Sequence, residues 1–411
     1  MKDEHDPGLL SFEEALRHIT DTVQPLTAQR CVSLREALDG MTAQDVRAPM
    51  HVPPFVNSAM DGYAINSMDL PASGEKRLRV LGKSFAGKPF AGNIKLGECV
   101  RIMTGAVVPE GADTIVMQEH AKVDGEHIVI STGHTKGQHV RHPGDDFSAG
   151  DTIIHAGERL TPAKLGLLAS TGVTELQILR KPIVAFFSTG DELKGVGQTL
   201  RPGDIYDSNR YILFGMLKKL GVDFLDMGVV PDVKSEIEHT LQEAANCADV
   251  IITSGGASVG EADFIKQILD DMGAVKFWKI AMKPGKPLAF GKIGNKLFFG
   301  LPGNPVSAMA TFYLFVQPAL RLLEGEKISP SIQLKARCSN LLKKQPGRKD
   351  FQRGVLQVNN QGELIVDTTG IQGSHMLSSM AKANCFIVLP RDAGNVEAGS
   401  EVDVLLFNGL I

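Results

Sequence analysis

Cysteine and aromatic residues are scarce in this chain, and a long apolar run is missing. Its 411 residues include five cysteines and one tryptophan. The cysteines lie far apart and form no Cys-x-x-Cys pair, so the sequence favours scattered core residues in a reducing compartment over a disulfide framework or a zinc ribbon. No segment approaches the ~20 apolar residues of a membrane span, and the acidic N-terminus lacks the apolar region of a signal peptide. We therefore expect a cytoplasmic protein that does not enter a membrane.

An excess of charge of either sign is also missing. Lysine and arginine number 43 and aspartate and glutamate 47, which gives a net charge of −4. Because there is no basic arm or tail, no binding to nucleic acid is expected. The hydrophobic share of 43% is ordinary for a globular protein. At ~100–200 residues per domain, the length allows roughly two to four domains.

The N-terminal part of the chain changes in character near residue 46. Ser11–Glu14 has the pattern S-x-x-E of a capping box, which predicts the start of a helix. Ser33–Glu36 repeats the pattern and predicts a second, short helix that Gly40 ends. From residue 46 to 146, short β-prone runs alternate with Gly, Pro and Asp turns, which predicts a small β-rich domain.

Residues 181–326 alternate apolar runs with amphipathic segments. Ile183–Phe187 is a continuous apolar run, and Ile212–Leu220 places its apolar residues on one face of a helix. Buried strands that alternate with such helices predict a doubly wound, mostly parallel sheet, in which ligands bind beyond the carboxyl ends of the strands. After residue 327, strand-like runs and the hairpin signal Asn359–Gly362 predict a small β-barrel or sandwich.

Four polar loops follow strand candidates of the α/β region: Ser188–Glu192, Ser254–Asp263, Lys283–Pro287 and Pro302–Pro305. We expect them to converge on one crevice at the carboxyl edge of the sheet. In the third loop, prolines fix φ and a glycine relieves crowding, so a rigid turn can hold Lys283 and Lys286 toward one oxyanion. Lys279 belongs to the same positive cluster. A solvated basic face is the alternative, and it suits Lys276 better.

A glycine-rich turn begins at Ser254, Gly255 and Gly256, between a strand and a helix. Its free N–H groups and the helix dipole suit a phosphate, although tight turns also use glycine where no ligand binds. The turn matches neither G-x-G-x-x-G nor the P-loop, so neither a dinucleotide site nor a kinase-type ATPase is predicted.

Carboxylates accompany these turns. Glu192 and Asp263 lie beside glycine turns at the expected carboxyl edge, where they can hold Mg²⁺ against phosphate oxygens. The alternative for Asp263 is an acid in the first turn of a helix, which the helix dipole favours. Asp232 directly precedes Val233 and is explained equally well as the N-cap of a helix.

Chemical reasoning alone leaves the polar residues outside the α/β region ambiguous. Asp61 precedes a glycine and suits a turn. Arg141 and Asp146 belong to another charged turn, and Arg353 and Ser374 supply basic and hydroxyl groups near the C-terminus. None of these has a spacing that fixes its role.

Eight motifs occur in order along nearly the whole chain: NSAMDGYA (57–64), RIMTGA (101–106), STGDEL (188–193), SGGASVGEADF (254–264), KPGKP (283–287), GLPGNPVS (300–307), DFQRG (350–354) and QGSH (372–375). Together they resemble the molybdopterin molybdenumtransferase family, to which the gephyrin E-domain also belongs. That family carries out the last step of molybdenum cofactor synthesis.

The resemblance implies four regions and an elongated homodimer. Residues 1–45 and 147–180 would form N-terminal helices and a linking domain, 46–146 an inserted β-rich domain, 181–326 an α/β molybdopterin-binding fold, and 327–411 a C-terminal β-barrel. Each site would be shared between subunits, and the inserted domain would bring these residues to the partner's crevice: Asp61, Thr104, Arg141 and Asp146.

The resemblance also implies a reaction on adenylylated molybdopterin and molybdate. With Mg²⁺, the pyrophosphate bond is cleaved, AMP leaves and molybdenum enters the dithiolene. The motif positions imply that Asp61, Glu192 and Asp263 act at the metal and phosphates, and that Lys279 and Lys283 hold substrate anions. Further substrate-binding residues would be Thr104, Arg141, Asp146, Asp232, Ser254, Gly255 and Gly256. The molybdate pocket would contain Lys286, Pro287, Ser307, Arg353 and Ser374, and cationic and hydroxyl donors do suit a tetrahedral dianion.

The chain departs from the family pattern at three places. Ala257 and Glu261 stand where Val and Asp are more usual, and Glu261 keeps the carboxylate. His142-Pro143 replaces a more basic pair, which lowers the anion affinity expected of the Arg141 loop. As protein partners, the resemblance suggests the molybdopterin adenylyltransferase and molybdenum-free acceptor enzymes.

Two other classes of function remain as alternatives. Another enzyme of the same α/β fold, such as a molybdopterin adenylyltransferase or a nicotinamide-nucleotide amidase, could share the SGG turn but would need neither the MDGYA segment nor the DFQRG segment. A scaffold module is the second alternative, because the gephyrin E-domain also has that role. The chain shows no added recognition segment that would favour it.

Overall fold

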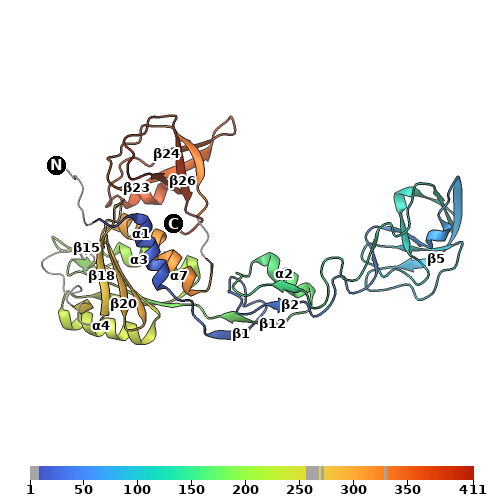
Figure 1. Cartoon of the computed structure of the whole chain (residues 1–411), viewed down its shortest axis with the longest axis horizontal. Coiled ribbons are helices and arrows are strands. Elements are labelled where there is room, and N and C mark those ends of the chain that lie inside the picture. Colours follow the sequence, from blue (N-terminus) through green and yellow to red (C-terminus); the bar gives the residue numbers. More distant parts are fainter. Residues whose placement is uncertain (1–8, 256–267, 270–272, 328–330) are drawn as a thin grey trace. The chain divides into compact units, whose positions relative to one another are not determined.

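The computed structural model describes residues 9–255, 268–269, 273–327 and 331–411 of the chain (Figure 1). The chain divides into two compact units. The first unit joins the residues up to Arg30 to those from Leu179 onward, and the second is the continuous segment Cys31–Ile178. Each unit has hydrophobic cores of its own.

The second unit contains a six-stranded sheet with the strand order β7-β4-β6-β5-β9-β8. Successive side chains of a strand point to opposite faces, and on one face Ile65, Leu78 and Ile128 are fully buried in a common core. The predicted β-rich region is thereby confirmed. Its strands are β4 (Gly62–Ile65), β5 (Glu75–Ser84), β6 (Glu98–Ile102), β7 (Thr114–Met117), β8 (Ala121–Asp124) and β9 (His127–Ser131), with the short pair β3 (Asn57–Ser58) and β10 (Val140–Arg141) and the 3₁₀ turns η1 (Ser67–Asp69) and η2 (Gln118–His120).

A linking region with two strand pairs and one helix completes this unit. Strand β1 pairs with β12, and β2 pairs with β11. Helix α2 begins after Thr161, whose side chain accepts a hydrogen bond from Lys164 N. The elements are β1 (Gln29–Ser33), β2 (Val46–Arg47), β11 (Thr152–Ile154), α2 (Pro162–Ser170) and β12 (Glu175–Leu179).

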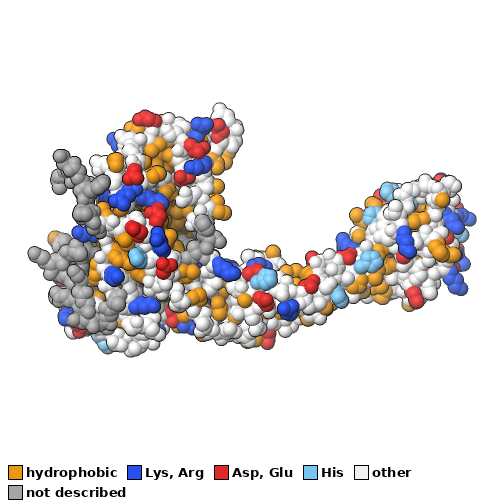
Figure 2. All heavy atoms as spheres, in the orientation of Figure 1, with side chains coloured by type: hydrophobic (Ala, Val, Ile, Leu, Met, Phe, Trp, Pro, Cys, Tyr) orange, Lys and Arg blue, Asp and Glu red, His pale blue; other side chains and the backbone are white. Residues whose placement is uncertain are grey.

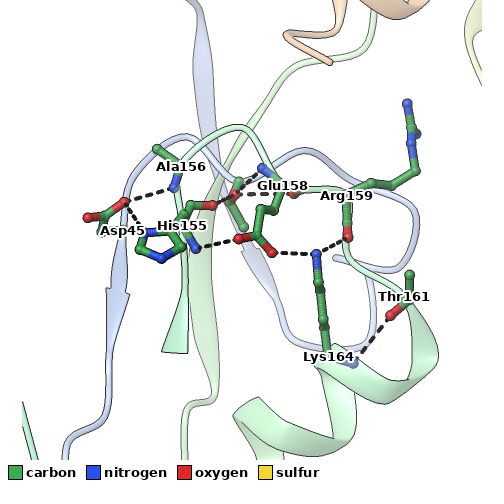
Figure 3. A network of polar contacts seen from close by, with 8 residues as sticks. Asp45, His155, Ala156, Glu158, Arg159, Thr161 and Lys164 are labelled. Atoms are coloured by element: carbon green, nitrogen blue, oxygen red, sulfur yellow. Dashed lines mark hydrogen bonds and ion pairs between the residues drawn. The ribbon is translucent and has the colours of Figure 1, made fainter. Parts of the chain in front are cut away.

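A polar network ties the loops of the linking region together (Figure 3). The Glu158 carboxylate accepts from Lys164 Nζ at 2.5 Å and from His155 N at 3.3 Å. Asp45 accepts from Ala156 N at 2.9 Å in the same network. The hydrogen bond from Lys164 is the main cause that holds the pKa of Glu158 below its ordinary value. Side-chain contacts therefore fix the connection between β11 and α2.

The prediction of a second short helix after Ser33 was wrong. The capping pair itself forms, because Glu36 N donates to Ser33 Oγ at 3.4 Å and Ser33 Oγ donates to the Glu36 carboxylate at 3.0 Å. Residues 34–39 nevertheless form only turns. Asp39 adopts a φ of 61° and Gly40 N donates back to Ala37 O, which turns the chain away before a second helical turn can form. At Ser11 the same signal does start a helix, α1 (Phe12–Thr22).

The first unit is built on a six-stranded sheet with the order β16-β13-β17-β21-β20-β18. The four strands from β16 to β21 are parallel to one another, whereas β20 runs antiparallel to both of its neighbours. The prediction of a mostly parallel sheet is confirmed. The strands are β13 (Ile183–Thr189), β16 (Asp223–Val230), β17 (Val250–Ser254), β18 (Gly273–Lys279), β20 (Pro287–Ile293) and β21 (Lys296–Leu301), and β14 (Leu193–Lys194) pairs separately with β15 (Ile205–Tyr206).

Helices cover both faces of this sheet, as the doubly wound prediction requires. Phe186 and Phe187 are adjacent on β13 yet belong to two different hydrophobic cores. The core of Phe186 includes residues of α1 and α3 (Ser208–Leu220), and the core of Phe187 includes residues of α4 (Lys234–Cys247). The period of two along the strand places consecutive apolar side chains on opposite faces, which explains the continuous apolar run in the sequence.

A continuous helical segment, Pro305–Leu323, runs through the core of Phe186. It consists of α6 (Pro305–Thr311), the π-helical turn η3 (Phe312–Val316) and α7 (Gln317–Leu323). By length and composition alone it could cross a membrane, but 83% of its most apolar stretch is buried inside the protein. A buried core helix passes the same test.

The C-terminal region forms a closed five-stranded barrel, which confirms the barrel of the two predicted alternatives. The strands follow the order β23-β24-β22-β26-β25, and β25 pairs again with β23 to close the ring. The predicted hairpin at Asn359–Gly362 joins β23 to β24. The elements are β22 (Leu334–Cys338), β23 (Lys349–Val358), β24 (Leu364–Thr368), α8 (Leu377–Lys382), β25 (Cys385–Leu389) and β26 (Glu401–Leu406), and β19 (Met282–Lys283) pairs with β23.

Candidate functional site

The described parts of the four predicted loops lie at one edge of the α/β sheet. Strands β13, β17 and β21 are parallel, and β18 points the same way because it is antiparallel to β20, which is itself antiparallel to β21. Their carboxyl ends therefore share an edge. Gly255 N donates to Leu301 O at 3.3 Å, which joins the ends of β17 and β21 directly. Within the Ser254–Asp263 loop, only Ser254 and Gly255 are among the described residues.

A cavity of about 870 Å³ lies between loops of this edge and the barrel. Lys283, Lys286, Lys343 and Arg348 line it, and among the described residues no carboxylate does. On the outer surface, by contrast, acidic and basic side chains are interspersed (Figure 2). The cavity is therefore chemically suited to an anion. Its lining comprises residues 282–287, Asn304, Ser307, Leu341, Lys343, Arg348, Gln352, Thr368 and 370–374.

The lysine loop of the cavity is held in one conformation by its backbone. Ile280 N donates to Lys286 O at 2.7 Å, and Gly285 has a φ of 97°. A side chain at Gly285 would place Cβ 2.7 Å from Thr311 Oγ1, so glycine is required there. Lys283 is exposed and Lys286 is half-buried, so both ammonium groups remain accessible.

The structure brings five of the predicted residues to this cavity: Lys283, Lys286, Pro287, Ser307 and Ser374. Lys279 ends β18 opposite Pro287 but does not contribute to the lining. Lys343, Arg348, Gln352 and Thr368 of the barrel do contribute, and the sequence prediction did not include them. Gln352 belongs to the DFQRG motif, whereas no motif marks Lys343, Arg348 or Thr368, which the closure of the barrel places there.

Arg353 is not in the cavity lining, contrary to its predicted place in the molybdate pocket. Its side chain is 1% exposed, and Nη2 donates to Gly373 O at 3.0 Å while Nε donates to Ser379 Oγ at 3.1 Å. Burial lowers the pKa of Arg353 to about 10. The guanidinium therefore stabilises the loop that carries Ser374 through a buried hydrogen bond to its backbone.

Carboxylates cluster where β13 and β16 end. Asp232 N donates to Asp191 Oδ1 at 3.2 Å, and burial together with the charges of Asp191 and Glu192 raises the pKa of Asp232. The N-cap interpretation of Asp232 was wrong, since α4 begins at Lys234 with Val233 as its N-cap and has no side-chain cap. Asp232 lies instead beside the two other acids.

The donor set of this carboxylate cluster suits Mg²⁺. The ion prefers carboxylate oxygens and usually takes one or two carboxylates together with substrate phosphate oxygens. Burial first, and then the like charges of Asp191 and Glu192, raise the pKa of Asp232, and a bound cation would relieve the repulsion between the acids. Within the described residues, no group of three or more acidic, histidine or cysteine side chains is arranged so that it could hold a metal ion by itself, so an ion here would also need substrate oxygens. Asp263 and Gly256, also predicted for this region, lie outside the described residues.

A second cluster of predicted residues lies in the other unit. Thr104 donates to Asp61 Oδ1 from both N, at 2.7 Å, and Oγ1, at 2.8 Å, and these bonds lower the pKa of Asp61. Arg141 pairs with Asn57 in the register of β10 and β3. Asp146 is exposed, and its N–H donates to Val52 O at 3.0 Å. The motifs at 57–64 and 101–106 and the charged turn with Arg141 and Asp146 therefore meet in this unit through backbone contacts.

Three family descriptions together match most of the chain. Residues 10–172 match the MoeA N-terminal region, domains I and II. Residues 185–322 match the probable molybdopterin binding domain, and residues 335–407 match the MoeA C-terminal region, domain IV.

Relatives that match nearly the whole of this chain show the same similarity. A molybdopterin molybdenumtransferase of Haemophilus influenzae is 45% identical over 98% of this chain and 100% of its own length. Gephyrin of Dictyostelium discoideum is 33% identical over 97% of this chain and 62% of its own length. The crystal structure of the molybdopterin biosynthesis MoeA protein from Pyrococcus horikoshii OT3 superposes with a TM-score of 0.85 at 28% identity, covering 97% of this chain and all of the other.

Proposed function

The chain belongs to the molybdopterin molybdenumtransferase family, enzymes of molybdenum cofactor biosynthesis, and we propose that it inserts molybdenum from molybdate into adenylylated molybdopterin with Mg²⁺-dependent release of AMP. One observation carries this proposal. The cavity at the sheet edge is lined by four cations and, within the described residues, by no carboxylate. Such a lining suits a tetrahedral oxyanion such as molybdate.

Lysines and hydroxyl groups would hold the molybdate. Lys283 and Lys286 come from one rigid turn, and the hydroxyl groups of Ser307 and Ser374 can donate from two other elements of the lining. Charge-assisted hydrogen bonds of this kind are roughly twice as strong as neutral ones. The arrangement orients the oxyanion from several sides and excludes competing cations.

Carboxylates would hold the magnesium ion. Glu192 and Asp232 are the described candidates in the α/β unit, with Asp263 and Asp61 as further predicted ligands. When bound, Mg²⁺ stabilises the negative charge that develops on the leaving AMP. Lys279, at the end of β18, would hold a substrate phosphate.

The proposal includes a homodimer in the cytoplasm whose sites are shared between subunits. Asp61 and Thr104 lie in one compact unit and the cavity in the other, so the two predicted clusters come from separate bodies of the chain. The molybdopterin adenylyltransferase would supply the adenylylated substrate, and molybdenum-free enzymes would accept the product.

A turnover assay tests the proposal. The purified protein is given adenylylated molybdopterin, Mg²⁺ and molybdate, and AMP release and activation of a molybdenum-free acceptor enzyme are followed. We expect AMP release that depends on molybdate and is lost in the double variant Lys283→Gln/Lys286→Gln. Lys276→Gln is the matched control, because Lys276 is an exposed lysine of β18 outside the cavity. Nucleotide binding without cleavage would contradict the proposal and favour a carrier or scaffold.

A further inference from the structure

Asn209 connects two of the loops at the carboxyl edge of the sheet. It lies in the first turn of α3 and is 8% exposed. Its Nδ2 atom donates to Ser254 Oγ and to Gly303 O, each at 2.7 Å. Ser254 ends β17 and Gly303 follows β21, so one amide group bridges the loops that leave two adjacent parallel strands.

This bridge fixes the hydrogen-bonding role of Ser254. An amide nitrogen can only donate, so Ser254 Oγ accepts from Asn209 and keeps its own proton for another acceptor. Ser254 is 3% exposed, and its hydroxyl donates to no other described residue. The hydroxyl is thus prepared to donate to an anionic oxygen beyond the end of β17.

The same bridge orients the peptide that follows Gly303. The C=O and N–H of one trans peptide unit point in opposite directions. Because Gly303 O is held by the side chain on α3, the N–H of Asn304 points away from α3. Asn304 also lines the cavity. A single side chain therefore directs two donors, one in each loop.

The hydrogen bonding of Asn209 itself is not optimised for stability. Its Oδ1 atom is buried without a hydrogen-bond partner among the described residues, and so is Oδ2 of Asp207, the N-cap of α3. An unpaired buried acceptor lowers the stability of the folded protein. A buried amide that keeps one unpaired oxygen is typical of a functional site. Here the two hydrogen atoms on Nδ2 are the donors that bond the two loops.

We propose that Asn209 is a positioning residue that sets Ser254 and the Gly303–Asn304 peptide as donors to an anionic phosphate group of the substrate. The proposal rests on the proposed function for the identity of that substrate. Asn209 acts through the two loops and does not itself contact the phosphate. The part of its effect that passes through Ser254 therefore depends on the presence of Ser254.

A double-mutant cycle in AMP binding tests this dependence. AMP affinity is measured by titration calorimetry for the wild type, Asn209→Ala, Ser254→Ala and the double variant. We expect Asn209→Ala alone to weaken AMP binding by about tenfold, the effect of one hydrogen bond to a charged group. In the Ser254→Ala background the same change should cost clearly less, about threefold, because only the Gly303–Asn304 donor then remains to be lost and contacting residues are not additive.

Asn209→Asp keeps the test decisive if Asn209→Ala does not fold. The side chain has the same shape, but its carboxylate cannot donate to Gly303 O at neutral pH. We expect its AMP affinity, relative to wild type at the same pH, to recover as the pH is lowered and the carboxyl gains an O–H donor. Thermal unfolding of the same variant at each pH separates the two roles, because a purely structural role would make AMP affinity change only together with the melting temperature. Asn246→Ala is the matched control, because Asn246 is an exposed asparagine on α4, and it should leave AMP affinity unchanged.

The outcomes separate this inference from the proposed function. If the wild type binds and releases AMP but the cycle is additive, the positioning role is wrong and the proposed function stands. If the wild type neither binds AMP nor releases it from the adenylylated substrate, both are wrong.

Discussion

At the scale of single residues, burial divides the cations of the site into two kinds. Lys283 is exposed and forms no ion pair with a described residue, so its charge is available to a ligand. Arg353 is buried, and its Nε and Nη2 atoms donate to Ser379 Oγ and Gly373 O. The first kind can bind an anion directly, whereas the second fixes the loop through which another group binds it.

Replacing Arg353 should therefore change molybdate binding through the loop. We expect Arg353→Lys to lose about 1–3 kcal/mol of unfolding free energy, because the buried Gly373 O loses a donor, and to raise the KM for molybdate several-fold. Urea unfolding and steady-state kinetics measure the two effects. Arg337→Lys, on the exposed side of β22, is the control. If the stability falls and the KM for molybdate is unchanged, Arg353 stabilises the barrel and has no role in molybdate binding.

Asp232 should show the opposite relation between stability and activity. Its pKa is raised above the ordinary value of 3.8, so the folded state binds this proton more tightly than the unfolded state does. The ionised carboxylate therefore costs stability, by an amount that is absent below pH 3.8 and complete above the raised pKa. We expect Asp232→Asn to raise the melting temperature at pH 7, with a gain that shrinks as the pH falls, and to weaken Mg²⁺-dependent AMP release.

Thermal unfolding across this pH range measures the effect of Asp232→Asn. Asp223→Asn, an exposed aspartate at the opposite end of β16, should give no gain. A lower melting temperature for Asp232→Asn at pH 7 would show that the ionised Asp232 carboxylate does not lower the stability of the protein.

At the scale of elements, backbone conformation decides where the turns of the site can form. Gly255 has a φ of 95° at the end of β17, and a Cβ there would lie 2.8 Å from Thr189 O. Gly215 lies inside α3, where an added Cβ would meet open space, with no contacting atom within 4 Å. The same residue type therefore serves a strained turn in one place and weakens a helix in the other.

These two glycines should respond in opposite directions to the same change. We expect Gly255→Ala to destabilise the protein by about 1–3 kcal/mol, since φ is positive and the space is filled. Gly215→Ala should stabilise it by about 0.5–1 kcal/mol through the lower entropy of the unfolded chain. Urea unfolding of both variants provides the comparison, and equal effects would contradict the assignment of strain to Gly255.

At the scale of the whole molecule, the predicted residues are divided between two compact units. Asp61, Thr104, Arg141 and Asp146 belong to the continuous unit Cys31–Ile178, whereas Glu192, Asp232 and the cavity belong to the other. A site that needs both sets can be completed within one chain or between the two chains of a dimer.

Mixing two inactive variants distinguishes these arrangements. If the sites are shared between subunits, a heterodimer of Asp61→Ala and Glu192→Ala chains has one intact site and one doubly altered site. We expect co-expressed, randomly paired chains to recover about a quarter of wild-type AMP release, because half of the dimers are heterodimers with one active site each. Each variant alone is the control. No recovery by verified heterodimers would place each site within one chain.

The sequence by itself determined the features that depend on neighbouring residues. The capping box at Ser11, the hairpin at Asn359–Gly362 and the alternation of apolar strands with amphipathic helices all appear as predicted, because local hydrogen bonds and periodicity specify them. The shared edge at which the described parts of the polar loops lie also followed, since parallel strands have their carboxyl ends on one edge, but among the described residues the cavity is lined by only two of the four loops.

The tertiary structure alone decided the features that join distant residues. It buried Arg353 beneath the 371–374 loop, placed Asp232 beside Asp191, and brought Lys343 and Arg348 to the cavity. It also gave Asn209 its two loop contacts. Burial and side-chain pairing depend on how strands and helices pack, and residues with no motif of their own acquire their surroundings only when the barrel closes and the sheet is covered.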